Sequence, residues 1–114
     1  MAKVYEFLAN GFEEVEALAP VDILRRGGIE VKMVSVTGSN LVESSHGVVV
    51  KADLLFENIT DFSDADLLML PGGMPGSKNL NEHEGVRNAL KEQFEKGKRV
   101  AAICAAPLVL ASVG

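Results

Sequence analysis

Strand-like and helix-like segments alternate along this chain, and this alternation limits its fold more than any other feature of the sequence. Apolar runs predict strands at residues 3–9, 29–36, 66–70 and 99–103. Helical spacing predicts helices at residues 13–26 and 82–96, the second of them amphipathic, and another helix is expected at residues 107–113. Between the second and third strands, residues 38–51 are expected to form a short antiparallel excursion. This order is typical of an α/β fold with a mainly parallel sheet.

Three loops follow the carboxyl ends of the predicted strands, and they cover residues 10–16, 71–77 and 103–107. In open parallel sheets, ligands bind outside this edge. We therefore expect the chemistry of the protein to lie in these loops.

The charge balance of the chain argues against some classes of partner. Its 114 residues fit one domain, and 16 acidic against 11 basic side chains give a net charge of −5. No basic cluster offsets this charge, so we expect no binding to nucleic acid or to anionic membrane surfaces.

Two further features bear on the location of the protein. Residues 100–114 carry no charge, but this run is shorter than the roughly 18 residues that a membrane span needs, and Pro107 interrupts it. We expect it to be core sequence. With one cysteine no intrachain disulfide can form, so a cytoplasmic, reducing location is expected.

Cys104 is the strongest single feature of the sequence. It follows the last predicted strand and precedes a predicted helix, with Ala102 and Ala106 two residues away on either side. This spacing is that of a nucleophile elbow, with Ala in place of Gly. A thiol at a helix N-terminus meets unpaired N–H groups and the positive end of the helix dipole, which favour the reactive thiolate. The alternative is that a lone Cys among Val, Ala and Ile is a small core residue.

Three acids, Glu13, Glu14 and Glu16, crowd the first loop and the start of the helix that follows it. Exposed acids are favourable at a helix N-terminus, so a purely structural role is one interpretation. The functional interpretation is that Glu16 turns towards the strand ends and hydrogen-bonds the Cys104 thiol.

The second loop reads PGGMPG at residues 71–76 and contains neither a P-loop nor a dinucleotide-binding pattern. Glycines allow backbone N–H groups to point at a reacting oxygen. The amides of Gly73 and of Ala105, the residue after Cys104, could form an oxyanion hole, with Gly72 beside them. The alternative is an ordinary tight turn.

The chain has two histidines, His46 in the excursion and His83 near the start of a polar helix. His46, like Glu14, could reach a site or an interface, whereas His83 is expected to be solvated. One Cys and two dispersed His have no metal-ligand spacing, so we expect neither a metal site nor a cofactor.

Four segments of the chain together resemble the ThiJ/PfpI superfamily, which is class I glutamine-amidotransferase-like. They cover essentially the whole chain and read NGFEEVE at 10–16, PVDILRRGGI at 20–29, LPGG at 70–73 and AAICAAP at 101–107. Within the superfamily they are most similar to the branch of the Parkinson-disease-associated protein and its bacterial deglycase-like homologues.

The resemblance implies a flavodoxin-like three-layer α/β/α sandwich that forms a homodimer. It implies that Cys104 is an oxidation-sensitive nucleophile, that Glu16 is its acidic partner, and that Gly73 and Ala105 supply the oxyanion amides. The implied function is glyoxalase- or deglycase-like action on small aldehydes or glycated groups. The alternatives are a redox-sensing stress or chaperone protein without dedicated catalysis, and an intracellular protease- or amidase-like member.

Two departures from the family pattern affect these expectations. The most similar branch often has Arg where His46 stands, and members are usually considerably longer than this chain. Residues 1–114 are therefore expected to form a single ThiJ/PfpI-type domain whose C-terminal part is missing. The chain is then an inactive fragment, a degenerate member, or one that a separate C-terminal chain completes.

Overall fold

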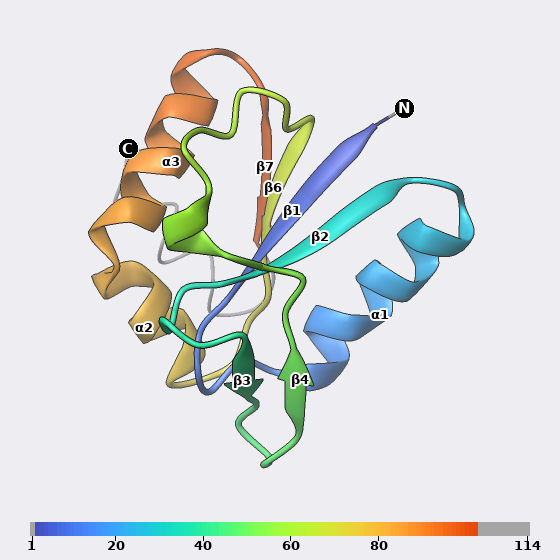
Figure 1. The fold of residues 1–114 in the computed structure, drawn as a ribbon, viewed down its shortest axis with the longest axis vertical. Coiled ribbons are helices and arrows are strands. Elements are labelled where there is room, and N and C mark those ends of the chain that lie inside the picture. Colours follow the sequence, from blue (N-terminus) through green and yellow to red (C-terminus); the bar gives the residue numbers. More distant parts are fainter. Residues whose placement is uncertain (1, 103–114) are drawn as a thin grey trace.

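A five-stranded parallel sheet forms the centre of the computed structural model, which describes residues 2–102 (Figure 1). The strands lie in the order β5-β2-β1-β6-β7, and neighbouring strands are parallel. They are β1 (Lys3–Leu8), β2 (Glu30–Ser35), β5 (Leu54–Leu55), β6 (Leu67–Leu70) and β7 (Arg99–Ala102). A separate antiparallel hairpin consists of β3 (Leu41–Glu43) and β4 (Val49–Lys51), which confirms the predicted excursion.

Helices cover both faces of this sheet. Those described are α1 (Glu14–Arg26), α2 (Gly76–Glu82) and α3 (Glu84–Glu95), with a short 3-10 helix, η1 (Phe56–Asn58), after β5. α1 lies on one face, and α2 and α3 lie on the other (Figure 1). This arrangement confirms the expected flavodoxin-like three-layer sandwich with a mainly parallel sheet.

Successive side chains of the central strand, β1, point to opposite faces of the sheet and contribute to two apolar layers. Tyr5 and Phe7 pack in the cluster under α2 and α3, whereas Val4 and Leu8 pack in the cluster under α1. Phe7 and Leu8 are completely buried. A strand with apolar residues on both faces is typical of a parallel sheet that helices cover on both sides.

The ends of α1 follow from its sequence. Glu13 is the N-cap, and its carboxylate accepts a hydrogen bond from Val15 N at 2.6 Å. Arg25 and Arg26 occupy the last turn, where cations suit the helix dipole. The chain then leaves the helix through Gly28, whose φ of +82° favours glycine.

The segment after β6 differs from the prediction, because a separate helix, α2, precedes α3. The α2 sequence contains Gly, Ser and two Asn residues, which are weak helix formers. Gly76, Ser77 and Leu80 are nevertheless buried. Tertiary packing therefore stabilises this helix more than intrinsic propensity does.

His83, which was expected to be solvated, is only partly exposed. His83 is the N-cap of α3, and its Nδ1 accepts a hydrogen bond from Val86 N at 3.1 Å. Its ring also packs on Phe56 of η1, with 4.9 Å between ring centroids. The sequence analysis missed both η1 and the two-residue strand β5, because such short elements carry no periodic pattern.

The helix expected at residues 107–113 lies outside the described residues. Within residues 2–102, no helix is long and apolar enough to cross a membrane.

Candidate functional site

The loops after β1 and β6 leave the sheet at the same edge, as the sequence predicts, because β1 and β6 are neighbouring parallel strands. These loops are residues 10–16 and 71–77. β7 is the next parallel strand, and its last residue, Ala102, pairs with the end of β6. The chain therefore reaches this edge immediately before the predicted nucleophile. Cys104 and Ala105 themselves lie outside the described residues.

Backbone hydrogen bonds fasten the first and second loops to each other. Glu13 N donates to Gly72 O at 2.9 Å, and Gly76 N donates to Gly11 O at 3.0 Å. The approach is so close that a Cβ on Gly73 would lie 2.4 Å from Glu13 N. The two loops therefore hold one relative position, and glycine at residue 73 is required for it.

The peptide that links Gly72 to Gly73 has a defined orientation. Its carbonyl accepts the hydrogen bond from Glu13 N, and the N–H of a trans peptide points in the opposite direction from its carbonyl. The Gly73 N–H therefore points away from Glu13 N. This orientation leaves the N–H as a candidate donor, and its role in an oxyanion hole stays a prediction.

The three neighbouring acids have three different environments. Glu13 caps α1, and Glu14 pairs with His46, with 2.8 Å between Oε1 and Nδ1. Glu16 is partly buried in the first turn of α1. Its assignment as the partner of Cys104 stays a prediction.

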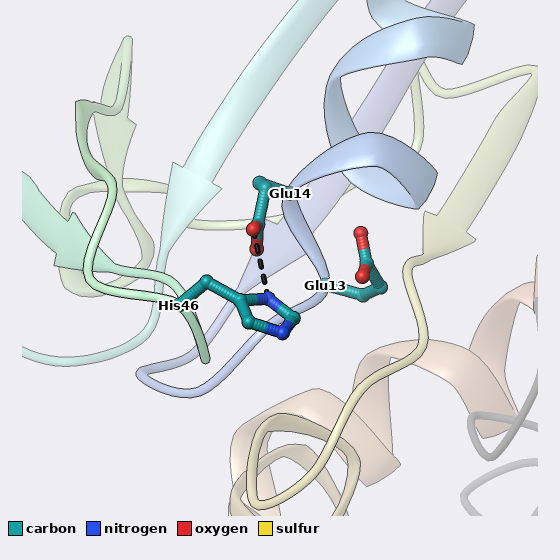
Figure 2. Close-up of side chains that lie close together, drawn as sticks. All are labelled: Glu13, Glu14 and His46. Atoms are coloured by element: carbon teal, nitrogen blue, oxygen red, sulfur yellow. Dashed lines mark ion pairs between the residues drawn. The ribbon is translucent and has the colours of Figure 1, made fainter.

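Glu14 and His46 join α1 to the turn between β3 and β4, and Figure 2 shows the two side chains facing each other. A backbone N–H hydrogen bond holds the pKa of Glu14 below its ordinary value, with further contributions from the Ser44 hydroxyl and from His46. Glu14 is therefore a carboxylate at neutral pH. Nothing in the sequence pattern points to this specific pair, although both residues were expected near a site or an interface.

Glu13, Glu14 and His46 could together hold a divalent cation, because one ligand atom from each lies within 4.8 Å of the others (Figure 2). The sequence did not suggest this group, because the three residues lack a recognisable metal-ligand spacing. Exposed acidic groups are common without a metal, and here Glu13 caps α1 while Glu14 pairs with His46. We therefore assign the group to capping and ion pairing.

Asn10 and Asn79 hold the first loop from two sides, and sequence reasoning missed both roles. Asn10 Oδ1 accepts a hydrogen bond from Glu43 N at 3.1 Å, which ties the loop to β3. Asn79 Nδ2 donates to Asn10 O at 2.8 Å, which ties it to α2. The Asn10-Gly11 pair indicated a turn, but the distant partners of a turn cannot be read from its two residues.

A parallel α/β sandwich with two interlocked loops at the carboxyl edge of its sheet defines a flavodoxin-like protein with a candidate site at that edge. The chain belongs to the DJ-1/PfpI family, because the sequence model of that family matches residues 2–114. This match confirms the resemblance seen in the sequence.

Individual relatives agree with the family assignment. Protein DJ-1 homolog A from Arabidopsis thaliana is 43% identical over 100 residues, which are 88% of this chain and 25% of that protein. A deglycase from Thermococcus kodakarensis is 37% identical over 113 residues, which are 98% of this chain and 66% of that protein. The solved structure of oxidized Toxoplasma gondii DJ-1 superimposes with a TM-score of 0.94 at 39% identity, and the match covers all of this chain and 62% of that one. The chain thus spans between a quarter and two thirds of the length of these three relatives.

Proposed function

We propose that this chain carries the reactive centre of a cysteine-dependent, glyoxalase- or deglycase-like enzyme that acts on small aldehydes or glycated groups. The observation that carries the proposal is the interlocking of the acidic loop with the Gly72–Gly73 loop, beside the end of the strand that leads to Cys104. The relative from Thermococcus kodakarensis, which is named a deglycase, supports the same reaction class.

In the proposed reaction, the Cys104 thiolate attacks an aldehyde carbon and forms a hemithioacetal. The carbonyl electron pair moves to the oxygen, where the N–H groups of Gly73 and Ala105 stabilise the negative charge. Glu16 supplies the proton that this oxygen takes up. With methylglyoxal, Glu16 then moves a proton from the carbon bonded to sulfur to the adjacent carbon, while the hydroxyl proton on the first carbon passes to the oxygen on the second. The resulting lactate thioester reacts with water to give lactate and the free thiol, so no cofactor is needed.

The activity is proposed for the protein in its completed form. The relatives continue beyond the part that this chain matches. We propose that residues 1–114 are one DJ-1/PfpI-type domain and that a C-terminal part, in the same or in a separate chain, completes its site. We also propose a cytoplasmic location, which suits a thiol that must stay reduced.

A homodimer is proposed as well, through the surface formed by α1 and the β3–β4 hairpin. Ser45 N donates to Phe12 O at 2.8 Å and so holds the hairpin against the start of α1. Apolar side chains are exposed there, with Val15 68%, Leu41 55% and Val49 55% accessible. An exposed apolar surface of this kind is typical of a protein–protein contact.

Replacing Glu16 with glutamine tests the proposed proton transfer. The glutamine side chain keeps the shape of glutamate but cannot carry a proton to and from the substrate, so methylglyoxal consumption is expected to fall by about a hundredfold to ten-thousandfold. Lactate formation measures the rate, with Glu95→Gln on the exposed end of α3 as the matched control. An unchanged rate in Glu16→Gln would exclude the assigned role.

A redox-sensing role is the second candidate function, because the solved Toxoplasma gondii relative is described as oxidized. In that case mild peroxide adds two oxygens to Cys104, giving a sulfinic acid that mass spectrometry detects. Oxidation of this kind in a protein that consumes no methylglyoxal would favour the redox role over the enzymatic one.

A further inference from the structure

Glu6 is a charged residue type in the middle of the buried central strand. Its neighbours on the same face of β1, Val4 and Leu8, belong to the apolar cluster under α1. Glu6 itself is completely inaccessible to solvent. The run at residues 3–9 predicts a buried strand, and Glu6 is buried in it together with the apolar residues.

The Glu6 carboxyl has no hydrogen-bond partner. Both of its oxygens, Oε1 and Oε2, are buried without a donor. At the same register, β2 presents Met33 and β6 presents Met69, and neither offers a charge. An ionised carboxylate in such surroundings is far more costly than a neutral acid.

Arg25, in the last turn of α1, is the charged residue that acts on the Glu6 carboxyl. Its guanidinium donates to Val31 O at 2.9 Å and to Asp53 Oδ2 at 2.8 Å. Asp53, which precedes β5, also accepts a hydrogen bond from Met33 N at 2.8 Å. Arg25 is thus committed to other partners and compensates only part of the burial. Burial raises the pKa of Glu6 to about 9, and Arg25 opposes that rise.

We propose that folding of this chain takes up one proton from solution at Glu6, because the sheet and α1 close over its carboxyl only when the carboxyl is neutral. This proton uptake is independent of the chemistry proposed at Cys104. In the unfolded chain Glu6 loses its proton at the ordinary value of 4.5, whereas in the folded chain it keeps the proton up to a pH of about 9. The stability that Glu6 contributes is therefore complete below pH 4.5 and decreases as the pH rises towards 9.

Urea unfolding of the full chain between pH 5.5 and 8 tests the proposed proton uptake. Far-UV circular dichroism serves as the signal, since the chain has no Trp. The ratio of the unfolding constants of the wild type and Glu6→Gln is expected to rise about tenfold for each pH unit. The control is Glu95→Gln, which removes an exposed carboxyl and is expected to follow the wild type. A constant ratio between the wild type and Glu6→Gln would overturn the proposal.

A direct titration keeps the proposal testable if Glu6→Gln does not fold. Carbon-13 NMR of the glutamate side-chain carboxyls, with the Glu6 signal assigned through Glu6→Val, reports each protonation state in the folded wild type. We expect the Glu6 carboxyl to remain neutral at pH 7 while the exposed glutamate carboxyls are ionised. Ionisation of Glu6 below pH 6 in the folded protein would contradict the inference.

Discussion

Replacing Cys104 with serine is expected to lower methylglyoxal consumption by about a thousandfold or more. A hydroxyl is a far weaker nucleophile than a thiolate at neutral pH, and no other cysteine in the chain can take over. Production of lactate measures the loss. Cys104→Ala should lose activity to the same extent, because neither variant forms the hemithioacetal.

This experiment is best done on the chain alone and on the chain supplied with the C-terminal part of a DJ-1/PfpI relative. Activity that appears only after this addition would show that the relatives' C-terminal part is needed to complete the site. Full activity in Cys104→Ala would refute the nucleophile assignment. A wild type that is inactive in both forms would refute the enzymatic proposal itself.

Replacing Gly73 with alanine is expected to have the largest effect on stability, with a loss of about 2–5 kcal/mol in the free energy of unfolding. One part of this loss is backbone strain, because Gly73 has a φ of +99°. The other part is a clash, because the new Cβ would lie 2.4 Å from Glu13 N and 2.9 Å from the Phe12 carbonyl carbon. Both are backbone atoms that cannot rotate away, so the first loop must move away from the second. Urea unfolding measures the change.

Gly28→Ala is the matched control for this variant. Gly28 has a φ of +82°, but nothing lies within 4 Å of the position that a Cβ would take. It should lose only the strain contribution, about 1–2 kcal/mol. Equal losses in the two variants would mean that close contact between the loops contributes nothing, which would contradict the interlocked site.

The fold could be predicted from the sequence because its long elements carry strong patterns. Alternating strand and helix patterns predicted the parallel sheet and α1, which begins with acids and ends with arginines, as suits the helix dipole. The split into α2 and α3 could not be predicted, since burial of Gly76 and Leu80 stabilises a segment of weak helix formers. Burial of the Glu6 side chain could not be predicted either, because one acid within an apolar run does not show which way its side chain faces.

The candidate site could be predicted only in its loops. The positions of residues 10–16 and 71–77 follow from which strands precede them. The hydrogen bonds that hold the two loops together could not be predicted, because the one from Glu13 N to Gly72 O joins backbone groups far apart in sequence. The pairing of Glu14 with His46 likewise depends on how the β3–β4 hairpin folds back against α1.

The measurement that tests the central claim most directly is the pH dependence of Cys104 alkylation by iodoacetamide. Because Cys104 is the only cysteine, the intact mass of the chain reports its reaction alone. An activated thiol should reach half-maximal reactivity about one pH unit or more below the value in urea, where a free cysteine titrates at about 8.5. In Glu16→Gln the profile of the folded protein should shift relative to the wild type. The same profile in the folded and unfolded chains would contradict the assignment of this edge of the sheet as a nucleophile site.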